Sequence, residues 1–487
     1  MERTIVLYPG LAVGHFVPMM ELANAFLEHG YAVAVAFIDR PDKPPSLAAA
    51  VDRAASSSNA SFSFHRLPPA TPPPPSPGDD FIVRYYSLVR AYNGHLRSFL
   101  CSLPLRRVRA LVVDVFSVGA LDVAERLGVR TYAFYPSGAS ALAVYLQLPS
   151  FAASRPRGFG DLGDAPLEFA GVPPVPASHL SREMREPPES DLYKAALSLW
   201  GRVPDTDGIL VDTFQSLESR AVRALGDRRR RCVPGKALPP VFCVGPLVRA
   251  AAGAAEEREC LAWLDGQPDR SVVFLCFGSG GTHRPEQLRE IAAGLEASGH
   301  RFLWVVCAPK SRPTDPAPEP RLGELLPEGF LERIASKGQG LVVRSWAPQV
   351  DVLRHRATGA FVTHCGWNSV LEAITAGVPM LCWPLYAEQK MNKVFMVEEM
   401  RVGVEMVGWK EGLVAAEEVE AKVRLAMESA RGEELRERVA AHGDAAARAW
   451  MDGGSSRAEL ARFLSNVESG LLTNCMKRDD GDGEPPC

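Results

Sequence analysis

Short continuous apolar runs alternate with amphipathic helical patterns along both halves of the chain. The first run, Thr4–Tyr8, is followed by a helical pattern from Val17 to His29 and a second run, Tyr31–Ile38. Such runs are typical of strands covered on both faces, and their alternation with helices predicts a parallel, doubly wound α/β sheet. This half continues with strand Ala110–Asp114, helix Gly119–Leu127 and strand Arg130–Tyr135.

The alternation stops near Gly245-Pro246-Leu247 and then restarts, which predicts two domains in a chain of 487 residues. The second half contains strand Ser271–Phe277, helix Pro285–Ser298, strands Arg301–Val306, Leu341–Arg344 and Ala360–Val362, helix Asn368–Ala376 and strand Pro379–Cys382. The expected domains are residues 1–247, a linker 248–258, residues 259–465 and a disordered tail 471–487. We expect the proline-rich stretch 67–78 to be an extended loop, and 151–190 to be a long variable loop with short helices.

Composition narrows the class of protein without identifying it. The chain has a hydrophobic share of 46% and a charged share of 23%, which are ordinary for a globular protein. Its net charge of −4 shows no excess of positive charge for binding nucleic acid. No apolar stretch reaches the length of a membrane span, and the first strand is too short for a secretory signal. The ten cysteines contain no C-x-x-C pair, so we expect reduced thiols and a cytoplasmic location.

The segment Trp346–Gln389 carries the most specific chemistry in the chain. Its polar turn His364–Ser369 opens a helix, and free N–H groups at a helix N-terminus form a natural seat for a diphosphate. The indole upstream can stack on a flat base, and the polar run Tyr386–Gln389 at the end can bind vicinal hydroxyls. Together these parts predict a nucleotide-sugar site. A zinc site at His364-Cys365 is rejected because no second ligand pair stands at zinc spacing.

This segment closely resembles the plant secondary product glycosyltransferase box, the donor-binding stretch of plant UDP-dependent glycosyltransferases. It fills the 44-position span without a gap, and the resemblance extends along nearly the whole chain. The resemblance implies the GT-B fold, in which two Rossmann-like domains face a cleft, and an enzyme that needs no metal or other cofactor. It also implies that the helical pattern near 433–464 packs back across both halves, and so on the first domain. The helix dipole and His364 would then neutralise the departing UDP.

Roles within the box follow from the resemblance. Trp346 would stack on uracil, Ala347 would bond the base edge, Gln349 would lie near the ribose and Glu372 would accept from its hydroxyls. The donor set it implies is Ser279, Trp346, Ala347, Gln349, His364, Cys365, Gly366, Trp367, Asn368, Ser369, Glu372, Tyr386, Ala387, Glu388 and Gln389, with Thr282 beside Ser279 at the distal phosphate. Gln389 at the last position accompanies glucose transfer in most relatives, which favours UDP-glucose and leaves UDP-galactose as an alternative.

His15 and Asp114 are the candidate catalytic pair. The pKa of an unperturbed imidazole suits it to take a proton near neutral pH, and Asp114 ends a neighbouring strand, where it could orient the ring. The resemblance places the family's base and its carboxylate at these positions. Without the resemblance, the ordinary interpretation of His15 would be a residue at a helix N-terminus that bonds backbone groups. That of Asp114 would be a helix cap.

The acceptor is expected in loops of the first domain, with His15, Phe116, Tyr135 and Ser137 as candidate contacts. The surrounding segments are 81–86, 135–145 and 179–200. Short segments of the sequence are similar to those of plant flavonoid and isoflavonoid glucosyltransferases. This resemblance implies a small phenolic acceptor and leaves O- and C-transfer open. Pro136 departs from the family pattern, because many relatives carry a Thr whose hydroxyl contacts the sugar or its phosphate.

Two other classes of function stay possible from the residues alone. The Gly-rich turn after Ser271–Phe277 could serve a nicotinamide-dependent oxidoreductase, but it lacks the G-x-G-x-x-G fingerprint. A nucleotide-sugar-binding module without turnover would not need both His15 and Asp114. The sequence thus favours a monomeric transferase whose partners are UDP-glucose and a phenol.

Overall fold

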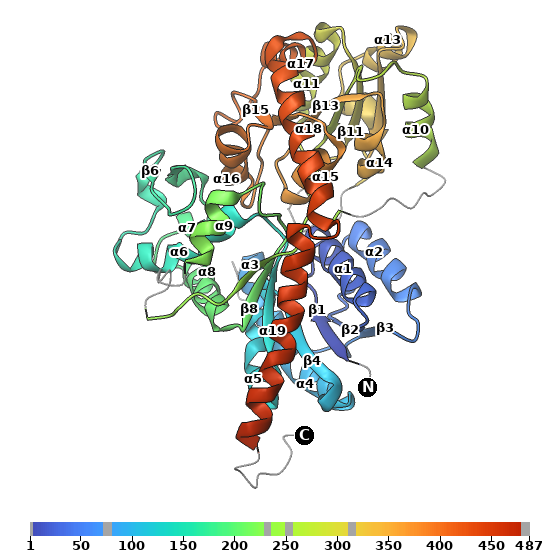
Figure 1. Cartoon of the computed structure of the whole chain (residues 1–487). Coiled ribbons are helices and arrows are strands. Elements are labelled where there is room, and N and C mark those ends of the chain that lie inside the picture. Colours follow the sequence, from blue (N-terminus) through green and yellow to red (C-terminus); the bar gives the residue numbers. More distant parts are fainter. Residues whose placement is uncertain (1–2, 72–79, 228–234, 249–256, 310–317, 479–487) are drawn as a thin grey trace. The chain divides into compact units, whose positions relative to one another are not determined.

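The computed structural model describes residues 3–71, 80–227, 235–248, 257–309 and 318–478 (Figure 1). The chain divides into two compact units, and we describe each by itself: unit 1 comprises Met1–Leu247 and Ala449–Cys487, and unit 2 comprises Val248–Arg448. Most of the proline-rich loop (72–79), most of the linker (249–256) and residues 479–487 of the expected tail lie outside the described residues.

Unit 1 is built on a seven-stranded sheet in which every neighbouring pair is parallel. In spatial order its strands are β3 (Phe62–Arg66), β2 (Ala32–Phe37), β1 (Thr4–Tyr8), β4 (Val108–Asp114), β5 (Thr131–Tyr135), β8 (Gly208–Val211) and β9 (Val241–Cys243). The central strands are buried almost throughout, which confirms the parallel doubly wound sheet predicted from their apolar runs.

Helices connect these strands. They are α1 (Val13–Glu28), α2 (Pro45–Ser56), α3 (Phe81–Ala91), α4 (Asn93–Ser102), α5 (Leu121–Leu127), α6 (Ala139–Ala153), α7 (Arg182–Arg185), α8 (Asp191–Arg202), α9 (Ser219–Gly226) and α19 (Ser455–Arg478), with 3₁₀ turns η1 (Leu105–Arg107), η2 (Val115–Ala120), η3 (Gly160–Leu162), η4 (Ala177–His179) and η5 (Val203–Asp205). The segment expected as a long loop also holds a two-stranded antiparallel ribbon of β6 (Pro166–Leu167) and β7 (Val175–Pro176).

The last helix belongs to unit 1. Phe463 of α19 stacks on Phe26 and meets Tyr132 and Phe242 edge to face, and the Tyr132 hydroxyl donates to Asn466 Oδ1 at 2.7 Å. Figure 1 shows this helix, in red, alongside the sheet of unit 1. The expected packing of the C-terminal helical pattern on the first domain is therefore seen for α19, and residues 449–465, which the sequence analysis counted with the second domain, belong to unit 1. Helix α19 also continues through 471–478, which had been expected to be disordered.

Unit 2 repeats the same plan with a parallel six-stranded sheet. In spatial order its strands are β12 (Gly340–Arg344), β11 (Arg301–Val306), β10 (Val272–Cys276), β13 (Thr358–Thr363), β14 (Met380–Cys382) and β15 (Gly403–Glu405). Its helices are α10 (Glu257–Asp265), α11 (Pro285–Ser298), α12 (Leu322–Leu325), α13 (Phe330–Ser336), α14 (Gln349–Arg354), α15 (Trp367–Ala376), α16 (Gln389–Val394), the π-turn η6 (Phe395–Glu399), α17 (Ala416–Glu428) and α18 (Ala430–Trp450).

Local sequence signals explain where the key helices of unit 2 begin and end. Pro285 opens α11, where its missing N–H costs nothing, and Gly299 closes that helix in the left-handed conformation. Gly377 closes α15 in the same way. These ends turn the chain back toward the start of the next strand, β11 or β14, at the amino edge of the sheet.

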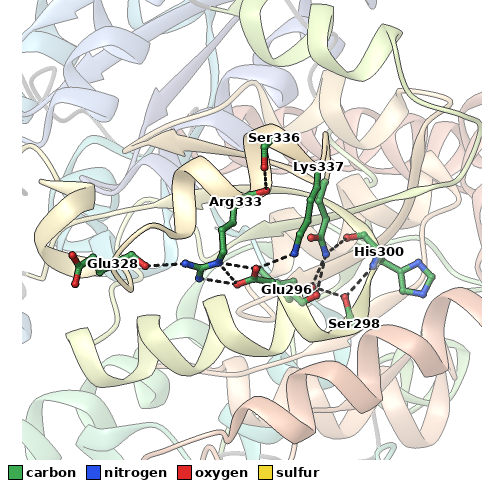
Figure 2. Close-up of polar contacts among 9 residues, drawn as sticks. Glu296, Ser298, His300, Glu328, Arg333, Ser336 and Lys337 are labelled. Atoms are coloured by element: carbon green, nitrogen blue, oxygen red, sulfur yellow. Dashed lines mark hydrogen bonds and ion pairs between the residues drawn. The ribbon is translucent and has the colours of Figure 1, made fainter.

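A polar cluster ties α11, α13 and β12 together at one end of unit 2 (Figure 2). The Arg333 guanidinium donates to both carboxylate oxygens of Glu296, and Lys337 donates to the same carboxylate at 3.2 Å. The Gln339 carboxamide, just before β12, donates to carbonyls at the end of α11. This cluster secures the start of the edge strand β12, which leads directly into the loop that carries Trp346.

Two further predictions can be compared with the structure. Cys243, Cys260, Cys276, Cys307, Cys365 and Cys382 are free thiols, whereas Cys101 is disulfide-bonded, so the expectation of reduced thiols throughout is wrong at that position. In the part of the chain that the structure describes, no helix has both the length and the apolar character needed to cross a membrane.

Candidate functional site

Each sheet has one point where the strand order reverses direction, and the candidate residues gather there. In unit 1 the reversal falls between β1 and β4, and in unit 2 it falls between β10 and β13. Open α/β sheets bind ligands at the carboxyl ends of the strands at such a point, because the two loops diverge and leave a crevice. The loops concerned carry His15 and Asp114 in unit 1, and Ser279 and His364 in unit 2.

His15 and Asp114 form a hydrogen-bonded pair. His15 lies in the first turn of α1, Asp114 ends β4, and His15 Nδ1 is 2.7 Å from Asp114 Oδ2. The carboxylate is fully buried, while 22% of the imidazole side chain is exposed. The other carboxylate oxygen accepts from the Phe116 N–H at 3.0 Å, so Asp114 both caps η2 and holds the histidine. Because an ionised carboxylate can only accept, Nδ1 carries the proton and Nε2 is the basic nitrogen.

Gly10 permits this pair to form. A Cβ atom at position 10 would lie 2.8 Å from both the Asp114 Cγ and the His15 Cβ, closer than packed atoms approach. Both of its neighbours belong to the pair, so neither could move aside without breaking the 2.7 Å contact. The sequence analysis did not single out Gly10, although a glycine between a buried strand and a helix is a signal of close backbone approach.

The candidate acceptor residues divide into two groups. Phe116 lies beside the pair, with its ring centroid 5.0 Å from that of His15. Tyr135 and Ser137 are buried, and Tyr135 meets Trp200 edge to face within the packing of unit 1. The geometry therefore brings Phe116 to the imidazole directly, and a contact of Tyr135 or Ser137 with an acceptor stays a prediction.

A cavity of about 320 Å³ lies in unit 1 between α3, η2 and α8. Phe116 lines it, together with apolar side chains and three cations: Val89, Val118, Leu199, Arg90, Lys194 and Arg202. Lys194 and Leu199 lie in the expected acceptor segment 179–200, whereas Arg90 and Arg202 lie outside the expected segments. The available signal was the four-residue spacing of Lys194, Ser198 and Arg202, which places them on one face of a helix.

In unit 2 the turn after β13 encloses the His364 imidazole. A Cβ at Gly278 would lie 2.6 Å from His364 Nε2, and one at Gly366 would lie 2.4 Å from the same atom. Burial lowers the pKa of His364 to about 4, and its Nδ1 has no hydrogen-bond partner. The imidazole is therefore neutral at pH 7. A contact of His364 with the diphosphate, whose charge would itself favour the protonated ring, stays a prediction.

Backbone strain marks the same loops. Of the five described non-glycine residues with positive φ, Ser345, Cys365 and Ala387 flank or belong to the candidate donor segment. Left-handed backbone costs an ordinary residue free energy, and such residues concentrate where function requires a particular loop shape. At Cys365 the strain reverses the chain into α15, so that Gly366 becomes its N-cap and the N–H groups of Trp367, Asn368 and Ser369 begin the helix.

Gln349, Ser369 and Glu372 form a hydrogen-bonded group. Gln349 Nε2 donates to Ser369 Oγ at 2.7 Å and to Glu372 Oε2 at 2.6 Å, which links α14 to α15. Removal of water from the Glu372 carboxylate raises its pKa to about 7, and the Gln349 hydrogen bond opposes that shift. The sequence analysis predicted that Gln349 and Glu372 serve one ribose, and the structure brings their side chains together.

The remaining donor candidates border this group. Trp346 is 54% exposed, which leaves its indole available for stacking, while Ala347 beside it is buried. The Tyr386 hydroxyl lies against Gly280 of the Gly-rich turn, where an added Cβ would come within 2.7 Å. Tyr386 thus joins the end of the segment to the loop that carries Ser279, which is exposed. Trp367, in contrast, is buried in unit 2.

Gln389 is tied to its own loop. Its Oε1 accepts from the N–H groups of Leu385 and Tyr386 at 3.0 and 2.9 Å, so only its NH₂ group remains to bind a sugar hydroxyl. Asn392, which the sequence analysis did not identify, donates to the Cys365 carbonyl at 3.0 Å and reaches Glu388 at 3.5 Å. These contacts link the polar turn His364–Ser369 to the polar run Tyr386–Gln389.

Among the described residues, no group of three or more His, Cys, Asp or Glu side chains is placed to hold a metal ion. This observation adds nothing to the argument for the reaction, which depends on the two residue groups above.

Comparison with known proteins identifies the family. Residues 232–424 match the family described as UDP-glucoronosyl and UDP-glucosyl transferase. A curated relative, an anthocyanidin 5,3-O-glucosyltransferase of a Rosa hybrid cultivar, is 41% identical over 94% of this chain and 98% of its own length.

Solved structures agree. A UDP-glucosyltransferase from Polygonum tinctorium capable of glucosylating indoxyl superposes with a TM-score of 0.85 at 36% identity, covering 96% of this chain and 99% of that one. Phytolacca americana UGT2, complexed with UDP-2fluoro-glucose and pterostilbene, gives 0.84 at 33% identity, covering 96% and 100%.

The chain belongs to the UDP-glycosyltransferase family and is a UDP-glycosyltransferase with the GT-B fold. The resemblance and the fold class predicted from the sequence are confirmed, and the oxidoreductase and the binding module without turnover are set aside.

Proposed function

We propose that this enzyme transfers glucose from UDP-glucose to a hydroxyl of a small flavonoid-like phenol, with inversion at the anomeric carbon and His15 as general base. The observation that carries the proposal is the 2.7 Å contact between His15 Nδ1 and the buried Asp114 carboxylate. A histidine held in this way has a defined basic nitrogen and a partner for its positive charge once it has taken a proton.

In the proposed reaction, His15 Nε2 takes the proton of the acceptor hydroxyl as that oxygen attacks the anomeric carbon. The bond between that carbon and the diphosphate breaks, and UDP departs with the electron pair. Attack from the side opposite the leaving group converts the α-linked donor into a β-glucoside. Asp114 stays ionised and stabilises the imidazolium.

The donor would be held by the residue groups of unit 2. The exposed Trp346 supports stacking on uracil, and the Gln349–Glu372 pair supports binding of the ribose hydroxyls. The first N–H groups of α15, with His364 beside them, supply donors for the diphosphate. No metal is needed in this scheme. Support for a glucose donor comes from Gln389 and from the complex of the Phytolacca americana relative with UDP-2fluoro-glucose.

Support for a phenolic acceptor comes from the relatives, which are described as acting on anthocyanidin and indoxyl or as binding pterostilbene. Phe116 beside His15 offers an aromatic wall to such molecules. Transfer to oxygen is favoured over transfer to carbon because the Rosa relative is an O-glucosyltransferase.

The test is to measure UDP release from UDP-glucose and from UDP-galactose with a panel of flavonoids and simple phenols, followed by product analysis. We expect release with UDP-glucose that depends on the phenol, and a β-linked O-glucoside. An α-linked product would refute inversion. Equal or faster turnover of UDP-galactose would refute the donor, and donor hydrolysis unaffected by any phenol would refute the acceptor class.

A further inference from the structure

The charged side chains that line the cavity between α3, η2 and α8 are all positive. Arg90 of α3 and Lys194 and Arg202 of α8 line it, and no Asp or Glu side chain of the described residues does. The remaining lining is mostly apolar, with Phe116, Val118 and Leu199 in its walls. A cavity of about 320 Å³ with this lining is of the size that takes a small organic molecule or one end of a larger one.

The three cations are not equally available to a ligand. Arg202 Nη2 is paired with Asp122 Oδ1 at 2.6 Å. Arg90 and Lys194 are exposed and make no ion pair with any described residue. Two positive charges from different helices therefore border one cavity without a compensating carboxylate. The two charges raise the local concentration of an anion. Because they lie at the exposed rim, they keep most of their water when an anion binds, so the cost of desolvating them is small.

The position of Phe116 relates the cavity to the chemistry. Phe116 lines the cavity, and its ring lies 5.0 Å from the His15 imidazole and 6.2 Å from the Tyr85 ring. The Phe116 ring thus belongs both to the cavity lining and to the surroundings of His15. An acceptor whose hydroxyl reached His15 and whose body passed this ring would bring its remote end toward Arg90 and Lys194.

Resting on the proposed function, we propose that this cavity selects acceptors that carry a carboxylate remote from the reacting phenol. The aromatic body would lie on Phe116 and Leu199, and the carboxylate would sit between Arg90 and Lys194 at the solvent-facing rim. An aromatic surface combined with paired donors for an anion is the combination that recognises an aromatic carboxylate.

The test uses two fluorescent hydroxycoumarins that share the reacting hydroxyl and differ only in a methyl or a carboxymethyl substituent. Equilibrium binding is followed by the fluorescence of the coumarin, and kcat/KM by the loss of phenolate fluorescence on glucosylation. The enzyme is compared with the double variant Arg90→Gln/Lys194→Gln. The control is Arg84→Gln, which removes an exposed cation from the same helix outside the cavity.

We expect the enzyme to bind the carboxymethyl coumarin about 5- to 10-fold more tightly than the methyl compound, as expected for two exposed charge contacts. The double variant should lose this preference while its affinity for the methyl compound changes by less than about twofold, and added salt should reduce the preference in the same way. The control should retain it.

Equal binding of the two coumarins by the enzyme would overturn the proposal, and so would an equal loss for both compounds in the double variant. Neither result would affect the proposed function, which the phenol panel tests separately. Preferential binding of the carboxymethyl compound without any glucosyl transfer to phenols would contradict the proposed function and leave the cavity's selectivity standing.

Discussion

The His15 imidazole and the Asp114 carboxylate lie 2.7 Å apart although 99 residues separate them in the chain. Their contact depends on β1 and β4 being parallel neighbours, with Tyr8 in register with Val113, so that both strands end at the same edge of the sheet. One residue then follows β1 into α1 and the other closes β4. A base and its orienting carboxylate are thus a consequence of the sheet topology.

Asp114→Asn should lower kcat strongly with little change in donor affinity. The carboxamide can still accept from the Phe116 N–H, but it offers His15 no negative charge to stabilise an imidazolium. We expect a loss of about 10²-fold or more in kcat, as for other positioned base pairs. The acid limb of the dependence of kcat/KM on pH should also shift to lower pH, because loss of the neighbouring negative charge makes the imidazolium easier to deprotonate. A variant with unchanged kcat would show that the carboxylate serves only the fold.

Gly10→Ala should damage turnover through the same pair. The new methyl group would lie 2.8 Å from atoms of both His15 and Asp114, so one of them must shift. Displacement of a base by a fraction of an ångström costs about 10²-fold in rate. Gly94→Ala is the matched control, because no atom lies within 4 Å of a Cβ added there. Similar kcat values for the two variants would contradict this assignment of Gly10.

Glu372 should make donor binding dependent on pH. Burial raises the pKa of this carboxyl to about 7, so it is ionised above pH 7 and increasingly protonated below it. Only the carboxylate can accept from two ribose hydroxyls, so the Kd for UDP-glucose should rise about tenfold between pH 8 and pH 6. Calorimetric titration measures this directly. Glu372→Gln should bind more weakly at pH 8 and lose the slope; an unchanged slope would assign it to another group.

Stability should depend on the charge of Glu296 in the polar cluster of unit 2 (Figure 2). The hydrogen bond from Arg333, opposed by burial and helped by Lys337, lowers the pKa of Glu296 below its usual 4.5. A depressed folded pKa means that the stabilisation is present above pH 4.5 and is lost as pH falls through the folded value. The Tm difference between the enzyme and Glu296→Gln should therefore be small but positive at pH 7 and vanish in acid. A difference that does not change with pH would contradict this reading.

The sheets were predictable because their strands are covered on both faces. Val33, Val112 and Phe274 sit in uninterrupted apolar runs that no other element would bury so completely. The packing of the last helix was predictable only through the family resemblance, because helical periodicity does not reveal which surface covers a helix. The contacts themselves, of Phe463 with Phe26 and Tyr132, join residues that are remote in sequence.

The site was predictable where resemblance supplied the residues and the topology brought them together, as for Gln349 and Glu372. Properties that depend on the surroundings were not. The neutral state of His364 results from its enclosure near Gly278 and Gly366, and the charge around the cavity results from the packing of α3 against α8. Neither can be read from a motif.

The most direct test of the account is His15→Ala, with UDP-glucose affinity measured by calorimetry and turnover measured with the best phenol from the panel. The prediction is a kcat lower by about 10²- to 10⁴-fold with a donor Kd within about twofold of the unchanged enzyme, because the imidazole takes the acceptor proton and does not hold the nucleotide. A variant that binds UDP-glucose normally and turns over at the full rate would contradict the assignment of His15 as the base.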